Sequence, residues 1–205
     1  MSSRFGDDLA RSQGRISLNP MAHVDPIGTL LFPAIAFFTH APLIGWAKPT
    51  PVNPLRWRNK RVANFWVSIA GVICNFMIAI VAGITIRALY SAGMIDRNAV
   101  RAFFFGVFDK SFVNIDSTVA VGAIELVITF FVLNVALGVF NLLPIPPLDG
   151  SKVLESILPE SFAPAIEALE RFGFLLLFVA VFTGVLGVVF GVVMPLADAL
   201  VFIGS

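Results

Sequence analysis

Long apolar runs limit the possible folds of this chain more than any other feature. A helix needs roughly 20 mostly apolar residues to cross a bilayer. Four stretches meet or nearly meet that length, and a fifth is weaker: Ile27–Trp46, Ala63–Tyr90, Thr118–Leu143, Phe172–Phe190 and, as the weaker piece, Gly191–Gly204. They predict an all-α polytopic membrane protein with four to five apolar helices.

The composition agrees with a membrane protein and argues against other classes. Charged residues make up 13% of the 205 residues and hydrophobic residues 58%, whereas soluble domains carry about 25% charged residues. The net charge of +1 gives no reason to expect a nucleic-acid partner. Because the apolar runs are evenly spread, we expect one membrane-embedded domain over residues 1–205.

Basic residues predict how the helices are oriented. The loop Ala47–Val62 holds five Lys and Arg residues and no acid, which places it in the cytoplasm by the positive-inside rule. Ala63–Tyr90 then crosses outward, and Thr118–Leu143 returns. Ile27–Trp46 has basic flanks on both sides and contains Pro33 and Pro42, so both a true span and a re-entrant hairpin stay open.

The most specific chemical signal is Asp149, which follows a run of three prolines. Pro144, Pro146 and Pro147 cannot continue a helix, and Gly150 is expected to adopt unusual backbone angles. A carboxylate at membrane depth is costly and indicates function by default. The alternative is that Asp149 caps a short helix over Ser151–Leu158, although a cap does not explain the prolines.

A second polar residue, Asn75, lies within the apolar run Ala63–Tyr90. It follows Gly71 by four positions and therefore shares its helical face, and Ala70 with Gly71 permits close helix approach. Asn75 can act in a site or simply make a helix–helix hydrogen bond.

Two proline-spaced segments, Gly14–Thr29 and Gly45–Pro54, predict extended chain near the N-terminus. Prolines two or three positions apart favour an extended backbone with few N–H donors. We therefore expect a small β element near Gly14–His23 and Gly45–Asn53. His23 and Asp25 have the spacing of paired metal ligands on a strand, but a histidine in a turn explains the same spacing.

Together, the segments around Asp149, Asn75 and the two proline-rich stretches resemble the site-2 protease family of intramembrane zinc metalloproteases, in its compact bacterial branch without a PDZ domain. The resemblance runs from about Phe5 to about Leu158. It implies that Asp149 is a zinc ligand and that Asn75 contacts the substrate or the oxyanion. Together with the predicted orientation of the helices, it implies that Asn75 and Asp149 face a shared polar cleft that opens to the cytoplasm. It also implies a membrane-helix substrate and a multi-pass protein of the bacterial cytoplasmic membrane. Val72 departs from the family, which usually has proline there.

The chain also departs from the family at its central motif. The family supplies two zinc ligands and a glutamate base from H-E-x-x-H, whereas His23 and His40 are the only histidines here and neither is followed by Glu. An N-terminally truncated, inactive protease and a genuine pseudoprotease or membrane-helix-binding protein are both consistent with this departure. Zn²⁺ is expected in the complete family member and not as a tightly bound ion of this chain alone. A transporter would normally show paired repeats, which the sequence lacks.

Overall fold

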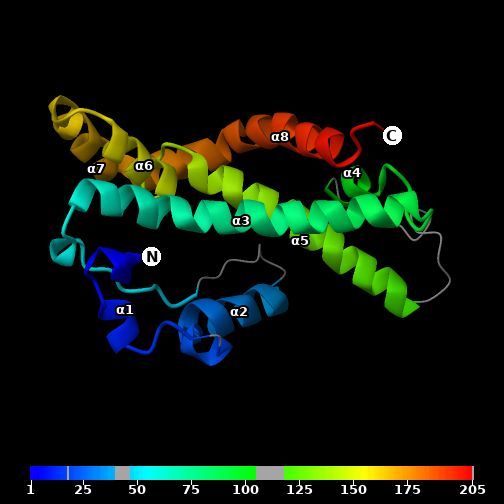
Figure 1. Cartoon of the computed structure of the whole chain (residues 1–205), viewed down its shortest axis with the longest axis horizontal. Coiled ribbons are helices and arrows are strands. Elements are labelled where there is room, and N and C mark those ends of the chain that lie inside the picture. Colours follow the sequence, from blue (N-terminus) through cyan, green and yellow to red (C-terminus); the bar gives the residue numbers. More distant parts are fainter. Residues whose placement is uncertain (18, 40–46, 105–117, 205) are drawn as a thin grey trace. The chain divides into compact units, whose positions relative to one another are not determined.

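The computed structural model describes residues 1–17, 19–39, 47–104 and 118–204 (Figure 1). The chain divides into two compact units, Met1–Val67 and Ser68–Ser205.

All regular elements of the described residues are helical. The N-terminal unit contains short 3₁₀ or π segments and two short α-helices, and the second unit contains most of the long helices. In chain order the elements are η1 (Ser2–Phe5), α1 (Leu9–Ser12), η2 (Pro20–Ala22), η3 (Pro26–Leu31), α2 (Phe32–Thr39), η4 (Pro54–Arg56), α3 (Lys60–Ser91), α4 (Ala99–Phe104), α5 (Thr118–Leu142), α6 (Asp149–Ile157), η6 (Glu160–Phe162), α7 (Ala163–Phe182) and α8 (Val185–Val201).

Two helices, α3 and α5, are long and apolar enough to cross a membrane, and the pair α7 and α8 counts as a third span if it is one broken helix. The predicted all-helical fold is therefore confirmed. The predicted span Phe172–Phe190 has the wrong bounds, because the helix bends by 67° between Phe182 and Val185. Gly184 adopts a left-handed φ of 78° at this break. Hydropathy could not locate the bend because the apolar residues continue through it.

The predicted apolar segment Ile27–Trp46 contains a shorter helix over Pro26–Thr39. At 1.5 Å per residue it is about 21 Å long, less than the roughly 30 Å of a bilayer's hydrocarbon core. The remaining residues of the predicted segment, 40–46, lie outside the described part of the chain. Within that part, this helix does not reach across a membrane by itself.

The small β element predicted near the N-terminus is wrong: within the described ranges the two segments form no strand. They do approach each other, because the Lys48 N–H donates to the His23 carbonyl over 2.9 Å. The buried guanidinium of Arg15 makes the other links, donating to the carbonyls of Ala22, Lys48 and Pro49. Nearby prolines lack the N–H groups that a strand ladder requires, so an arginine side chain supplies the donors instead.

Asp7 accepts a second group of hydrogen bonds in the same unit. Its carboxylate is almost fully buried and accepts hydrogen bonds from the Asn53 N–H (2.8 Å), the Leu9 N–H (3.1 Å) and the Ser2 hydroxyl (2.9 Å). The Ser2 hydroxyl in turn accepts from the indole of Trp57. These donors, led by the Asn53 amide, lower the pKa of Asp7 even though burial opposes them.

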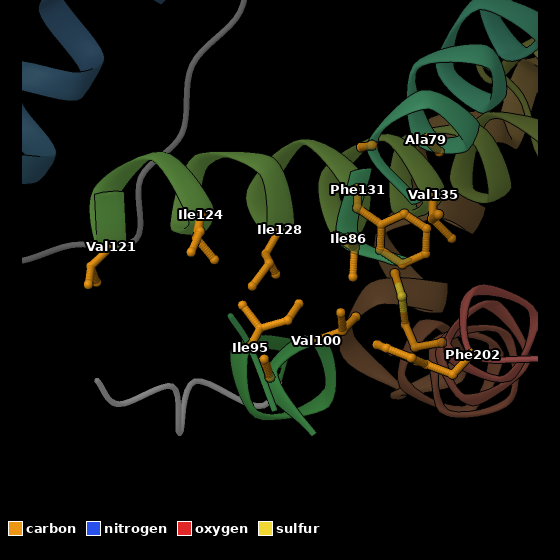
Figure 2. Packing of buried hydrophobic residues seen from close by; sticks show 13 residues of the cluster. Ala79, Ile86, Ile95, Val100, Val121, Ile124, Ile128, Phe131, Val135 and Phe202 are labelled. Atoms are coloured by element: carbon orange, nitrogen blue, oxygen red, sulfur yellow. The ribbon is translucent and has the colours of Figure 1, made fainter. Parts of the chain in front are cut away.

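The core of the second unit lies between α3, α4, α5 and α8. Figure 2 shows one face of α5, from Val121 through Phe131 to Val135, directed toward α4 and the C-terminal helix. Between α3 and α5, glycines leave room for aromatic rings. A Cβ on Gly83 would lie 3.2 Å from the Phe131 ring, and a Cβ on Gly138 would lie 2.9 Å from the Phe76 ring. Each helix thus places an aromatic ring over a glycine of the other.

We predict that Asp7→Ala loosens the N-terminal unit by about 1–3 kcal/mol, because the partly buried Asn53 and Leu9 amides lose their acceptor. Hydrogen exchange of these two amides should accelerate, whereas Asp8→Ala, which removes only an exposed 3.9 Å ion pair with Arg11, should leave it unchanged. Since the folded-state pKa of Asp7 is depressed, its contribution is present above the unfolded pKa of about 3.8 and is lost as the pH falls through the folded value. Equal exchange in both variants would contradict this role.

Candidate functional site

The turn between α5 and α6 carries the strongest sequence signal. α5 ends at Leu142, the prolines follow, and the Leu148 N–H closes a turn by donating to the Ile145 carbonyl over 3.0 Å. α6 then begins with Asp149 itself. The prolines therefore end one helix and let the next begin within a few residues, which fixes Asp149 close to the end of α5.

Gly150 permits this tight arrangement for a reason that differs from our expectation. It is not among the described glycines with positive φ. Instead, a Cβ at this position would lie 2.3 Å from the Leu142 carbonyl oxygen and 2.5 Å from that of Leu143. No side chain fits there, so Gly150 is required by close backbone approach rather than by unusual backbone angles.

A second glycine contact supports the turn from the other side. A Cβ on Gly173 of α7 would lie 2.5 Å from the Cβ of Pro146 and 2.7 Å from its carbonyl oxygen. Pro146 is buried, and it packs directly on the α7 backbone. Gly173 was not predicted from the sequence, in which it is an isolated glycine among bulky residues of α7.

The Asp149 carboxylate faces α3. Its Oδ2 atom lies 3.9 Å from the position that a Cβ on Gly71 would occupy, and the side chain is half-buried. Partial burial raises the pKa of Asp149, while Lys152 on the next turn of α6 opposes the increase. The cap of α6 falls on Leu148 and involves no side-chain hydrogen bond. The capping alternative is therefore wrong.

Asn75 lies one helical turn beyond Gly71 on the same face of α3. Four residues rise about 6 Å along a helix, so Asn75 is near the point that the Asp149 carboxylate faces. The Asn75 side chain is partly buried, and no hydrogen bond to it is found in the described part of the chain. By contrast, Asn134 and Asn141 on α5 each donate to a carbonyl of their own helix.

The other candidate ligands are engaged locally or lie outside the described residues. The His23 ring is 2.9 Å from the Ser17 carbonyl oxygen, and Asp25 accepts from the Ile27 and Gly28 amides at the start of η3. These contacts fit the turn interpretation of His23. His40 is outside the described ranges. Among the residues that are described, no three His, Cys, Asp or Glu side chains converge to hold a metal ion.

Comparison with known proteins gives a consistent result. The family model described as Peptidase family M50 matches residues 34–180. A Bacillus subtilis (strain 168) protein named "Putative zinc metalloprotease YwhC" is 34% identical over 184 residues, which cover 90% of this chain and 72% of the relative. The Mycolicibacterium smegmatis protein "Putative zinc metalloprotease Rip2" is 28% identical over 88% of this chain and 58% of the relative. No solved structure gives a significant match.

The Gly150 contact makes a direct prediction for the stability of the site. We expect Gly150→Ala to destabilise the protein by about 1–3 kcal/mol, the usual range for overpacking, because the added methyl group meets backbone oxygens that cannot move aside. Gly122→Ala is the matched control, since a Cβ there meets nothing within 4 Å and alanine favours the helix. Thermal unfolding in detergent should show a lower midpoint for Gly150→Ala alone. An unchanged midpoint would mean that this turn is looser than described.

Proposed function

This chain belongs to peptidase family M50, the site-2 proteases, and from that membership we propose that it serves the zinc-dependent cleavage of membrane-helix substrates. The observation that carries the proposal is the Asp149 carboxylate. It is half-buried, it does not cap its own helix, and its Oδ2 atom faces the bare Gly71 position on α3. A carboxylate held in this way is available to a ligand.

We assign Asp149 the role of a zinc ligand. Carboxylate oxygens bind Zn²⁺ in catalytic sites, where three protein ligands leave a fourth position open. When bound, zinc supplies a water of lowered pKa and polarises the scissile carbonyl. The described residues do not complete such a site, because no three His, Cys, Asp or Glu side chains converge among them. The remaining ligands would have to come from an H-E-x-x-H helix, which the sequence lacks.

Asn75 is proposed to contact the substrate beside Asp149. Its carboxamide offers both a donor and an acceptor, and it lies one turn from the position that Asp149 faces. A donor next to the scissile carbonyl stabilises the oxygen as negative charge develops on it. The membrane-helix substrate must unwind before cleavage, because its carbonyls are hydrogen-bonded within the helix.

Helix length and basic residues support a location in a bilayer. α3 and α5 are of spanning length, and the basic residues at the N-terminal end of α3 place that end on the cytoplasmic side. We propose a multi-pass protein of the bacterial cytoplasmic membrane, in contact with lipid and with a substrate helix.

A non-catalytic role is the second candidate, and one observation favours it. The sequence contains no H-E-x-x-H, and the described residues hold no three-ligand group. A chain with these properties can still bind a membrane helix through the face of α3 that carries Gly71 and Asn75. This pseudoprotease would bind the helix without cleaving it.

Zinc analysis and a cleavage assay on matched variants test the proposal. We would compare the chain as written, a fusion that adds an H-E-x-x-H helix at its N-terminus, and the same fusion with Asp149→Asn or Glu155→Gln. The fusion should bind about one zinc ion and cleave a membrane-helix substrate. Asp149→Asn should remove both properties, since asparagine keeps the volume but not the charged ligand. Glu155→Gln, on the exposed side of the same helix, should leave both intact.

The possible results separate the two candidates. Stoichiometric zinc or proteolysis from the chain as written would refute the expectation that this chain alone is inactive and binds no zinc tightly. Full activity of the Asp149→Asn fusion would refute the ligand assignment. Binding of a membrane helix by every form, with no zinc and no cleavage in the fusion, would favour the pseudoprotease.

A further inference from the structure

An open apolar groove of about 660 Å³ runs between α3, α5 and α8 in the second unit. This volume falls in the range of ligand pockets, roughly 300–1,000 Å³. Its α3 wall follows one helical face from Phe76 to Arg87, and its other walls include Val139 of α5 and Ala197 of α8. Apart from Arg87, every residue that lines the groove is apolar. It is separate from the Asp149 turn, which contributes no lining residue.

The groove has the depth of one bilayer leaflet. Phe76 and Arg87 are eleven positions apart, so the α3 wall is about 16 Å long, close to half of the roughly 30 Å hydrocarbon core. Arg61 and Arg87 are separated by about 39 Å on the same scale, near the 40–45 Å between the two headgroup regions. Arg87 therefore lies at headgroup level, at the mouth of a groove that ends near the bilayer centre.

Arg87 offers an unused donor at this mouth. Its Nη1 atom is buried, and no hydrogen-bond partner is found for it in the described part of the chain. The guanidinium carbon lies 6.0 Å from the centre of the Tyr90 ring, and that ring packs edge-to-face on Phe202. On α8, the Oδ2 atom of Asp198 pairs with Arg101 at 3.3 Å, and no hydrogen-bond partner is found for its Oδ1 atom in the described part of the chain. An oriented guanidinium with a free donor is well suited to bind phosphate.

From this geometry we propose that the groove is a specific phospholipid site. One acyl chain occupies the space between α3, α5 and α8, and the lipid phosphate accepts hydrogen bonds from Arg87. The apolar walls suit an acyl chain, and the depth of the groove, about one leaflet, suits the length of that acyl chain. The positive charge of Arg87 at the mouth is opposite to the negative charge of the phosphate. The site lies apart from the proposed metal ligand. It rests on the proposed membrane location and not on the zinc chemistry.

Two other occupants fit the groove less well. A transmembrane helix needs roughly 20 residues and 30 Å of apolar contact, about twice the depth available. The same limit applies to a spanning helix from a second copy of the chain, and neither would use the Arg87 donor. Both remain observable outcomes of the test below.

Native mass spectrometry of the full chain in detergent can measure this binding directly. The probes are dioleoyl phosphatidylglycerol and dioleoylglycerol, which share acyl chains but differ in the phosphate, with inorganic phosphate as a third. Phosphatidylglycerol should bind about tenfold or more tightly than dioleoylglycerol, the effect of a hydrogen bond to a charged group. Inorganic phosphate should show no binding at the same concentration.

Matched variants assign the binding to its two parts. Arg87→Gln should reduce phosphatidylglycerol binding to the level of dioleoylglycerol, Arg87→Lys should restore part of it, and Arg61→Gln should leave it unchanged. Ala197→Phe fills the groove and should weaken both lipids, whereas Ala199→Phe, exposed on the same helix and outside the groove, should weaken neither. Circular dichroism should show equal helix content in all five variants.

Several results would overturn the proposal. These are equal affinity for the two lipids, unchanged binding in Arg87→Gln or in Ala197→Phe, and binding of inorganic phosphate alone. A dimer that dissociates in Ala197→Phe would show that a second copy fills the groove. A photo-cross-link from position 80 to a co-expressed membrane helix instead of to lipid would show that a helix does.

Discussion

The close contact between Gly150 and the end of α5 is the constraint on which the site depends. With no side chain at Gly150, the first turn of α6 lies directly against the carbonyls of Leu142 and Leu143. Pro146, in the same turn, lies against Gly173 of α7. Two glycines in different helices thus hold one proline-rich turn from both sides. Because α6 begins at Asp149, this packing, and not a hydrogen bond of the carboxylate, determines where the carboxylate lies.

Holding the Asp149 carboxylate in this half-buried position costs free energy, because the carboxylate loses water. An apolar residue at this position would not have that cost. Partial burial raises the pKa of Asp149, and the carboxylate makes no capping bond that would offset the loss of water. Asp7 shows the contrast, since it is more deeply buried but accepts three hydrogen bonds that lower its pKa. Both oxygens of the Asp7 carboxylate therefore accept hydrogen bonds, whereas the half-buried Asp149 carboxylate does not cap its own helix. Together with membership of peptidase family M50, this difference supports a binding role for Asp149.

The sequence predicted what depends on local composition and missed what depends on packing. Apolar length predicted α3 and α5, and the prolines predicted the end of α5. The β element was wrong because extended, proline-rich chain satisfied its carbonyls with the Arg15 side chain. The bend at Gly184 and the roles of Gly150 and Gly173 were not predictable, since a glycine's contacts depend on which distant backbone approaches it. The expected cleft shared by Asn75 and Asp149 stays a prediction.

Cross-linking in a bilayer tests most directly whether Asp149 lies against the Gly71 face of α3. In a Cys74→Ser background, Gly71→Cys and Asp149→Cys would be joined with a short bifunctional methanethiosulfonate. Ile73→Cys with Asp149→Cys serves as the control, because position 73 lies about 200° around the helix from position 71. The account predicts rapid, near-complete cross-linking of the 71–149 pair and little of the 73–149 pair. Equal cross-linking of both pairs, or faster reaction of the 73–149 pair, would contradict it.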